Sequence, residues 1–153
     1  MTTSHRIHPI LKTRVVPINP EQAFELFTAR AGEWWPLTTH SIAGKDAVGI
    51  RFETGVGGVV VELTAGGGEH VWAEVTEWDP PRHFVLNWHP RIDPTAASTL
   101  EVSFSPVDGG TLVTLQHYGW ERFEAEAAEL REAYEEGWDV VLGRLETFLA
   151  DSR

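Results

Sequence analysis

The stretch "FEAEAAELREAYEEGWDVVLGRLETFL", residues 123–149, repeats apolar side chains at intervals of three and four positions. This spacing is typical of an α-helix with one apolar face. At about 1.5 Å per residue, the helix would be about 40 Å long, which is enough to cross a whole β-sheet. Its apolar stripe comprises Phe123, Ala127, Leu130, Tyr134, Trp138, Val141, Leu145 and Phe148. We therefore predict one long helix over 123–149 that packs on a sheet.

The chain before this helix is a series of short apolar segments separated by turn sequences rich in Gly, Pro and Asp. Short turns between strands are typical of an antiparallel meander. A further strand near the N-terminus brings the expected sheet to about seven strands, so the fold class is α+β. The expected strands are 13–18, 49–53, 58–64, 70–78, 83–89, 98–106 and 111–118.

Two short helices are expected after the first strand. The segment 19–29 begins with Asn19, a preferred N-cap residue, and Pro20, which suits the first helical position. A second short helical piece over Glu33 to Trp35 would stop at Pro36. These helices could close one end of a curled sheet.

An apolar cavity follows from this geometry. A twisted antiparallel sheet of this size curls, and one helix on its concave face leaves part of the space unfilled. The adjacent Trp34 and Trp35 must point in different directions, because neighbouring side chains diverge on any regular element. We expect one ring to pack in the core and the other to border the cavity, without deciding which.

Four motifs give the chain a family resemblance: "EWWPLTTHSI" (33–42), "VTEWDPPRHFVLNW" (75–88), "TLVTLQHYGWERF" (111–123) and "EEGWDVVLGRLETFL" (135–149). With the order of elements, they resemble the START-like superfamily, SRPBCC, in the branch related to the activator of the ninety-kilodalton heat-shock protein ATPase. The resemblance implies a single START-like domain over 1–153 with the helix-grip fold. In that fold, a curved antiparallel sheet wraps around a long C-terminal helix and encloses a hydrophobic cavity.

Six residues are the candidate ligand-binding set: Trp34, Trp35, Trp88, His117, Tyr134 and Trp138. Trp88 and His117 share strand faces with apolar residues, and the two helical residues lie one turn apart on the stripe. Each also has a purely structural reading, since a histidine after apolar neighbours is commonly a hydrogen-bonded core residue.

Trp72 and Glu74 rank below Trp88, because the inward face of their strand can instead be Val71, Ala73 and Val75. A carboxylate–histidine pair, for instance Glu74 with His117, could perform acid–base chemistry in a dry pocket. The sequence identifies no catalytic residue.

Composition excludes several classes of function. The chain has no cysteine and its histidines are scattered, so we expect no metal site and no cofactor. Its net charge of −11 argues against nucleic acid as a partner. No apolar run approaches the roughly 18–20 residues that span a bilayer, and no signal peptide is evident, so we expect no membrane insertion and a cytoplasmic location.

The first hypothesis is therefore a protein that binds an apolar or aromatic small molecule between the sheet and the C-terminal helix. The first alternative is an enzyme that uses the same cavity as a cyclase, dehydratase or hydrolase. The second alternative is an interaction protein similar to the chaperone-ATPase activators, which the resemblance allows. A homodimer is compatible with all three.

Overall fold

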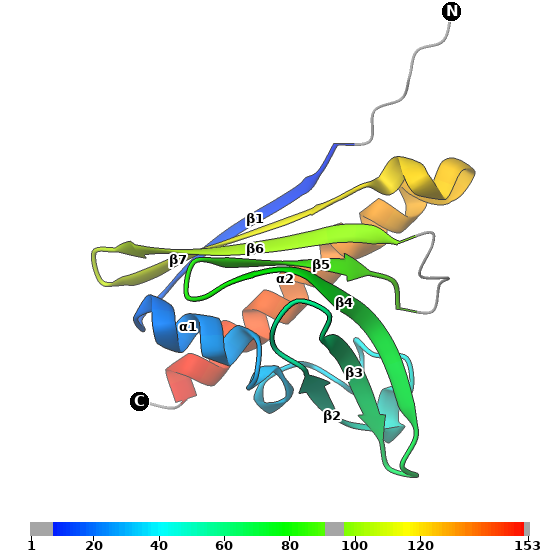
Figure 1. The fold of residues 1–153 in the computed structure, drawn as a ribbon, viewed down its shortest axis with the longest axis horizontal. Coiled ribbons are helices and arrows are strands. Elements are labelled where there is room, and N and C mark those ends of the chain that lie inside the picture. The colour runs from blue at the N-terminus through cyan, green and yellow to red at the C-terminus, as the bar shows by residue number, and fades with distance from the viewer. Residues whose placement is uncertain (1–7, 91–96, 152–153) are drawn as a thin grey trace, which may run out of the picture.

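The computed structural model describes residues 8–90 and 97–151. Within them, seven strands form one antiparallel sheet in the order β1-β7-β6-β5-β4-β3-β2 (Figure 1). The strands are β1 (Ile10–Val16), β2 (Ala47–Phe52), β3 (Val59–Thr64), β4 (Glu69–Asp79), β5 (His83–Trp88), β6 (Ser98–Val107) and β7 (Gly110–Tyr118). The helices are α1 (Pro20–Phe27), η1 (Ala31–Glu33), η2 (Gly44–Asp46), η4 (Trp120–Glu126) and α2 (Ala127–Asp151).

The sheet curves around α2, which runs across it from one side to the other (Figure 1). Strands β2 to β7 follow one another as a meander, and β1 pairs with β7 at the far edge. The α+β helix-grip fold is thus confirmed, with seven strands and a long C-terminal helix. The observed strand ends differ from the predicted ones by up to three residues.

Helix α1 begins where its sequence signals predict. The Asn19 side chain accepts from the backbone N–H of Gln22 at 2.8 Å, and the Gln22 side chain accepts from the backbone N–H of Asn19 at 3.3 Å. This reciprocal capping box satisfies donors that the first helical turn leaves free. The buried face of α1 consists of Ala23, Phe24, Leu26 and Phe27, which pack against the end of the sheet.

Two helix predictions need correction. The long helix does not start at Phe123: a 3₁₀ segment covers Trp120–Glu126, Glu124 has φ 52°, and α2 begins at Ala127. The positive φ takes the chain out of the right-handed helical region. The second short helix is the 3₁₀ turn Ala31–Glu33, so Trp34 and Trp35 follow it instead of lying within it.

The core lies between the concave face of the sheet and α2. The helix contributes buried side chains at Trp138, Val141, Leu142, Leu145 and Leu149. Leu130 and Tyr134, towards its N-terminal end, are only partly buried. The predicted stripe therefore divides into a C-terminal part that fills the core and an N-terminal part that leaves space beside it.

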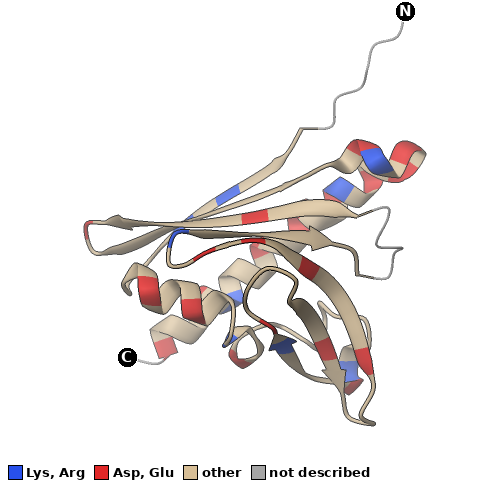
Figure 2. Cartoon of the chain, viewed as in Figure 1, with Lys and Arg blue, Asp and Glu red and all other residues tan. Residues whose placement is uncertain are grey.

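Acidic residues outnumber basic ones along α2 (Figure 2). Two cations on β1 meet them: Lys12 forms ion pairs with Glu135 and Asp139, and Arg14 Nη2 lies 3.1 Å from Asp139 Oδ1. Solvent-accessible pairs of this kind contribute little free energy individually. They do link the edge strand to the helix that crosses beside it.

Replacing Leu145 with Ala should lower the free energy of unfolding by about 2–5 kcal/mol, because the side chain is 3% exposed between helix and sheet. The matched control is Val140→Ala on the same helix, where the side chain is 47% exposed, and its effect should stay within about 0.5 kcal/mol. Urea unfolding of both variants measures the difference. Equal losses would mean that α2 does not pack through the Leu145 face.

Candidate binding site

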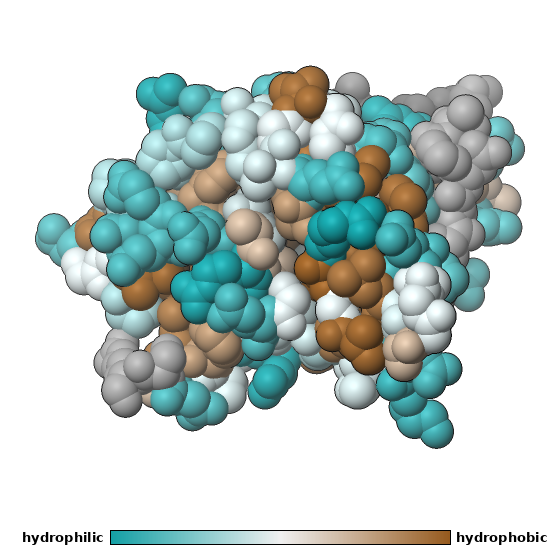
Figure 3. All heavy atoms as spheres, turned by 60° about the horizontal axis from the view of Figure 1, so that its bottom comes forward, coloured by the Kyte–Doolittle hydropathy of each residue, from teal (hydrophilic) through white to brown (hydrophobic). Residues whose placement is uncertain are grey.

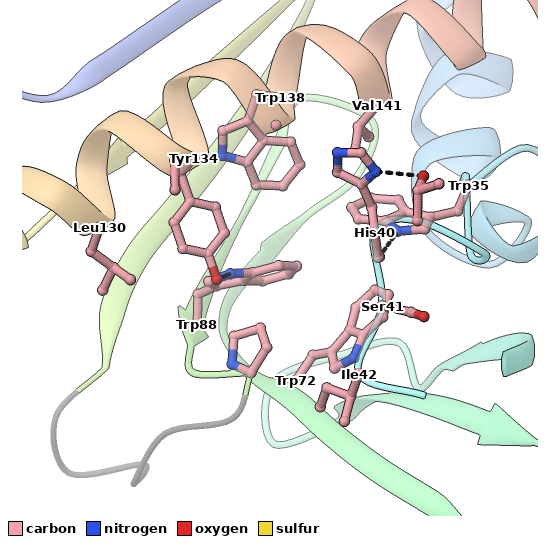
Figure 4. A pocket seen from close by; sticks show the side chains of 14 residues that line it. Trp35, His40, Ser41, Ile42, Trp72, Trp88, Leu130, Tyr134, Trp138 and Val141 are labelled. Atoms are coloured by element: carbon pink, nitrogen blue, oxygen red, sulfur yellow. Dashed lines mark hydrogen bonds between the residues drawn. The ribbon is translucent and has the colours of Figure 1, made fainter. Parts of the chain in front are cut away.

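A cavity of about 410 Å³ lies between α2, the concave face of the sheet and the loop that follows η1 (Figure 4). With its histidine neutral, the described lining carries no formal charge. The lining comprises Trp35, Thr39, His40, Ser41, Ile42, Trp72, Trp88, Pro90, Leu130, Ala133, Tyr134, Gly137, Trp138 and Val141. Most of this wall is therefore apolar and aromatic.

Four indole rings from distant parts of the chain meet at this cavity. The centroid of Trp35 lies 5.3 Å from that of Trp72 and 5.8 Å from that of Trp138. Trp88 completes the cluster, with its centroid 5.8 Å from Trp72 and 5.7 Å from Trp138. Tilted and edge-to-face arrangements at these separations are favourable for aromatic pairs. The rings therefore support one another in place and present aromatic surface to the cavity.

The side chains of the adjacent Trp34 and Trp35 point in different directions, as expected for neighbours in the chain. Trp34 is 1% exposed, and its Nε1–H donates to the carbonyl oxygen of Leu26 at 2.8 Å. Trp35 instead lines the cavity and donates from Nε1 to the carbonyl oxygen of His40 at 2.8 Å. Trp34 thus belongs to the core and drops out of the proposed ligand-binding set.

Trp72 reaches the cavity because of a β-bulge. Val60 pairs with Ala73 and Val61 with Val71, so Trp72 has no partner residue on β3. A bulge places two successive residues on one side of the sheet: Trp72 is 3% exposed and Ala73 is fully buried. Strict alternation is what led the sequence analysis to rank Trp72 below Trp88. Val71, named there as a possible inward residue, is 43% exposed.

The fully buried carboxylate of Glu62 holds the loop side of the cavity. Its two oxygens accept from the backbone N–H groups of Ile42 and Ala43, both at 2.7 Å. Oε1 also accepts from Trp72 Nε1 at 2.9 Å. The carboxylate of Glu62 on β3 therefore positions both the indole of Trp72 and the loop that carries His40. A single glutamate within an apolar strand has no distinguishing pattern, so the sequence alone does not predict this role of Glu62.

Polar groups at the cavity are few. Trp88 Nε1 donates to the hydroxyl oxygen of Tyr134 at 3.1 Å, across the junction of β5 and α2. His40 is half-buried, and its Nδ1 lies 2.8 Å from Thr39 Oγ1. Figure 4 shows the His40 ring on the opposite side of the cavity from Tyr134.

His117 lies behind the cavity wall and is absent from the lining. It is fully buried, Trp138 Nε1 donates to its Nδ1 at 3.0 Å, and its Nε2 lies 2.7 Å from Ser98 Oγ. An indole nitrogen can only donate, so Nδ1 is the acceptor and Nε2 carries the proton. Burial lowers the pKa of His117 to about 3. The neutral ring is a structural support for Trp138.

The suggested pairing of Glu74 with His117 does not occur. Glu74 points to the other side of the sheet, where its Oε2 lies 2.6 Å from Nε2 of His89 and its Oε1 accepts from Asn87 Nδ2 at 3.1 Å. Residues 91–96, which follow this cluster, lie outside the described residues.

Among residues 8–90 and 97–151 there is no group of three or more metal-ligating side chains, and no helix long and apolar enough to cross a membrane. On the face shown in Figure 3, apolar side chains reach the surface in separate groups between hydrophilic ones.

The buried His117 predicts a pH-dependent stability. Its folded-state pKa of about 3 is below the ordinary value of 6.5, so the unfolded chain binds the proton more readily. Stability is therefore complete above pH 6.5 and falls towards pH 3, by about 1.4 kcal/mol per pH unit from this group. Urea unfolding between pH 7.5 and 4.5 measures this slope. His117→Asn should show a flatter slope than the wild type, and an unchanged slope would contradict the assignment.

Replacing Glu62 with Gln should lower the free energy of unfolding by about 1–3 kcal/mol, because an amide NH₂ would face a backbone donor inside the protein. The control is Glu69→Gln, on the exposed part of β4, where only the ion pair to Arg51 is lost. Urea unfolding should show a clearly smaller effect for the control. Similar losses in the two variants would mean that the buried carboxylate is not a specific anchor.

Several solved structures are similar to this chain in fold. An anthrahydroquino-γ-pyrone synthase, Txn09 complexed with SUM, is 33% identical, with coverage of 87% of this chain and 90% of that chain and a TM-score of 0.58. Protein MLL2253 from Mesorhizobium loti is 19% identical, with coverage of 95% and 98% and a TM-score of 0.69. The Aha1 dimer from Colwellia psychrerythraea is 18% identical, with coverage of 94% and 96% and a TM-score of 0.65.

No curated protein matches this chain significantly. The model of one protein family matches residues 17–150, which include every strand from β2 to β7, all of α1 and all but the last residue of α2. That match covers most of the chain and agrees with the resemblance drawn from its motifs. The chain therefore belongs to the family described as activator of Hsp90 ATPase homolog 1-like proteins.

Proposed function

We propose that this protein binds a neutral, planar aromatic small molecule in the cavity between α2 and the sheet. The observation that carries the proposal is the wall itself: four indoles and a phenol surround about 410 Å³, with no carboxylate, ammonium or guanidinium group among the described lining residues. Four of the six candidates from the sequence, Trp35, Trp88, Tyr134 and Trp138, line this cavity together with Trp72, which supports their proposed role in ligand binding.

Physical chemistry supports a ligand of this class. Small-molecule sites are commonly apolar cavities of a few hundred Å³ with a small number of polar groups that orient the ligand. A charged ligand would lose its hydration without gaining a counter-charge, which is costly. A flat aromatic ligand would instead exchange water for the faces and edges of the indoles.

An enzyme that uses the same cavity is the second candidate, and the specific support for it is the synthase Txn09. Its 33% identity over 87% of this chain is higher than that of the Mesorhizobium loti and Colwellia psychrerythraea proteins. Its name refers to a fused aromatic product, which agrees in chemical class with the indole-lined wall. The chaperone-activator alternative ranks third, because a likeness of 18% identity to an Aha1 protein supports the fold alone.

The proposal predicts saturable binding of the neutral dye N-phenyl-1-naphthylamine, whose fluorescence rises in apolar surroundings. Replacing Ala133 with Trp should weaken binding at least about tenfold, because this exposed residue of α2 borders the cavity and a large ring would enter its mouth. The control Ala150→Trp makes the same change on the same helix, outside the lining. Its affinity should match that of the wild type.

The anionic analogue 1-anilinonaphthalene-8-sulfonate tests the charge argument in the same assay. It should bind more weakly than the neutral dye, since the described wall offers its sulfonate no cation. Equal effects of Ala133→Trp and Ala150→Trp, or tighter binding of the anion, would place the dye elsewhere and contradict the proposal. Native mass spectrometry of the protein from its host would show the ligand directly.

A further inference from the structure

His40 is a polar residue of the cavity lining whose backbone is held by hydrogen bonds. Its backbone N–H donates to the carbonyl oxygen of Pro36 at 2.8 Å, and its own carbonyl oxygen accepts from Trp35 Nε1 at 2.8 Å. Two and three positions further along the loop, the backbone N–H groups of Ile42 and Ala43 donate to the buried carboxylate of Glu62. The loop therefore presents the imidazole from a backbone held on both sides.

The free edge of the His40 ring faces α2 at a glycine. A Cβ atom added to Gly137 would lie 3.7 Å from Cδ2 and 3.9 Å from Nε2 of His40. Glycine in the middle of a helix is unfavourable relative to alanine. A Cβ atom added to Gly143, which lies six residues further along α2, would have no neighbouring atom within 4 Å. Of these two glycines, Gly137 is the one whose missing side chain leaves the imidazole uncovered.

The contacts of Thr39 favour the tautomer of His40 that carries the proton on Nδ1. Thr39 Oγ1 lies 2.8 Å from His40 Nδ1 and also has the carbonyl oxygen of Pro36 at 3.4 Å. If Nδ1 carries the proton, it donates to Oγ1, and the threonine hydroxyl is free to donate to the carbonyl. The opposite tautomer uses the hydroxyl hydrogen on Nδ1 and loses the second contact. The two-contact arrangement leaves Nε2 with an unprotonated lone pair.

From this arrangement we propose that the ligand is a hydroxylated aromatic, a phenol in the broad sense, whose O–H donates to Nε2 of His40. The inference rests on the proposed aromatic-binding function and specifies its chemical class. The indole faces hold the ring system, and the half-buried imidazole distinguishes a ligand that can donate a hydrogen bond from one that cannot.

The same contact is suited to proton transfer. When the hydroxyl oxygen acts as a nucleophile, its O–H bond breaks, the electron pair stays on oxygen, and an N–H bond forms at Nε2. The Nδ1–H of the resulting imidazolium still donates to Thr39 Oγ1, which stabilises the positive charge. A base oriented by a second hydrogen bond in this way is a recurrent element of acid–base catalysis. His40 is therefore the residue that an enzyme of this cavity would use as its base.

The experiment compares 2-naphthol with 2-methoxynaphthalene, which has the same ring system but no donor. Both should quench the tryptophan fluorescence of the wild type, and 2-naphthol should bind about five- to tenfold more tightly, as one hydrogen bond allows. His40→Phe should bind the two probes equally while keeping its affinity for the methoxy compound.

Gly137→Ala and Gly143→Ala form the matched pair on α2. Both gain helix propensity, but only the first places a methyl group against His40, so only the first should reduce the preference for 2-naphthol. Equal affinity of the two probes in the wild type, or a preference that survives His40→Phe, would overturn the assignment of His40 and leave the aromatic cavity intact. Absence of binding of either probe would instead overturn the proposed function.

Discussion

The concave face of a seven-stranded sheet is wider than the single helix that covers it, and the rest of the structure follows from this mismatch. The C-terminal part of α2 packs on the inner face of the sheet, and there the core is filled by side chains such as Leu142, Leu145 and Leu149. Nearer its N-terminal end, the α2 side chains of Leu130 and Tyr134 are only partly buried. Large side chains from the sheet and the loop partly occupy this region, and a cavity remains between them.

The aromatic cluster keeps that cavity open. Indoles are wide and rigid, and each ring at the cavity has a hydrogen-bond partner for its Nε1–H: His40 for Trp35, Glu62 for Trp72, Tyr134 for Trp88 and His117 for Trp138. Among the described residues, every buried side-chain nitrogen and oxygen has a partner. Because these bonds fix the orientation of each ring, the cavity can persist without a ligand inside it.

Two buried ionisable groups serve this arrangement from behind the wall. Glu62 carries its charge into the interior and offsets the desolvation with two backbone donors and one indole. His117 avoids a charge altogether, since burial lowers its pKa, and it uses both ring nitrogens as a neutral bridge between Ser98 and Trp138. Both ionisable groups thus support the wall without lining the cavity, whereas the half-buried His40 lines it.

The sequence by itself determined the order and type of the elements. The three–four spacing over α2, the turn signals between strands and the capping residues of α1 are local patterns, and each acts through neighbours in the chain. Three of the six candidate site residues are found at the cavity for the same reason, since Trp88, Tyr134 and Trp138 lie on apolar faces that a regular strand or helix turns inward.

Only the tertiary structure decided the remaining features, because each depends on a contact between distant segments. The bulge that turns Trp72 inward arises from the register between β3 and β4, and strict alternation hides it. Trp34 rather than Trp35 enters the core because the carbonyl oxygen of Leu26 lies within reach of its indole. His117 does not line the cavity because Trp138 lies between them and donates to its Nδ1. The role of Gly137 depends on the loop, which brings His40 close to this position of α2.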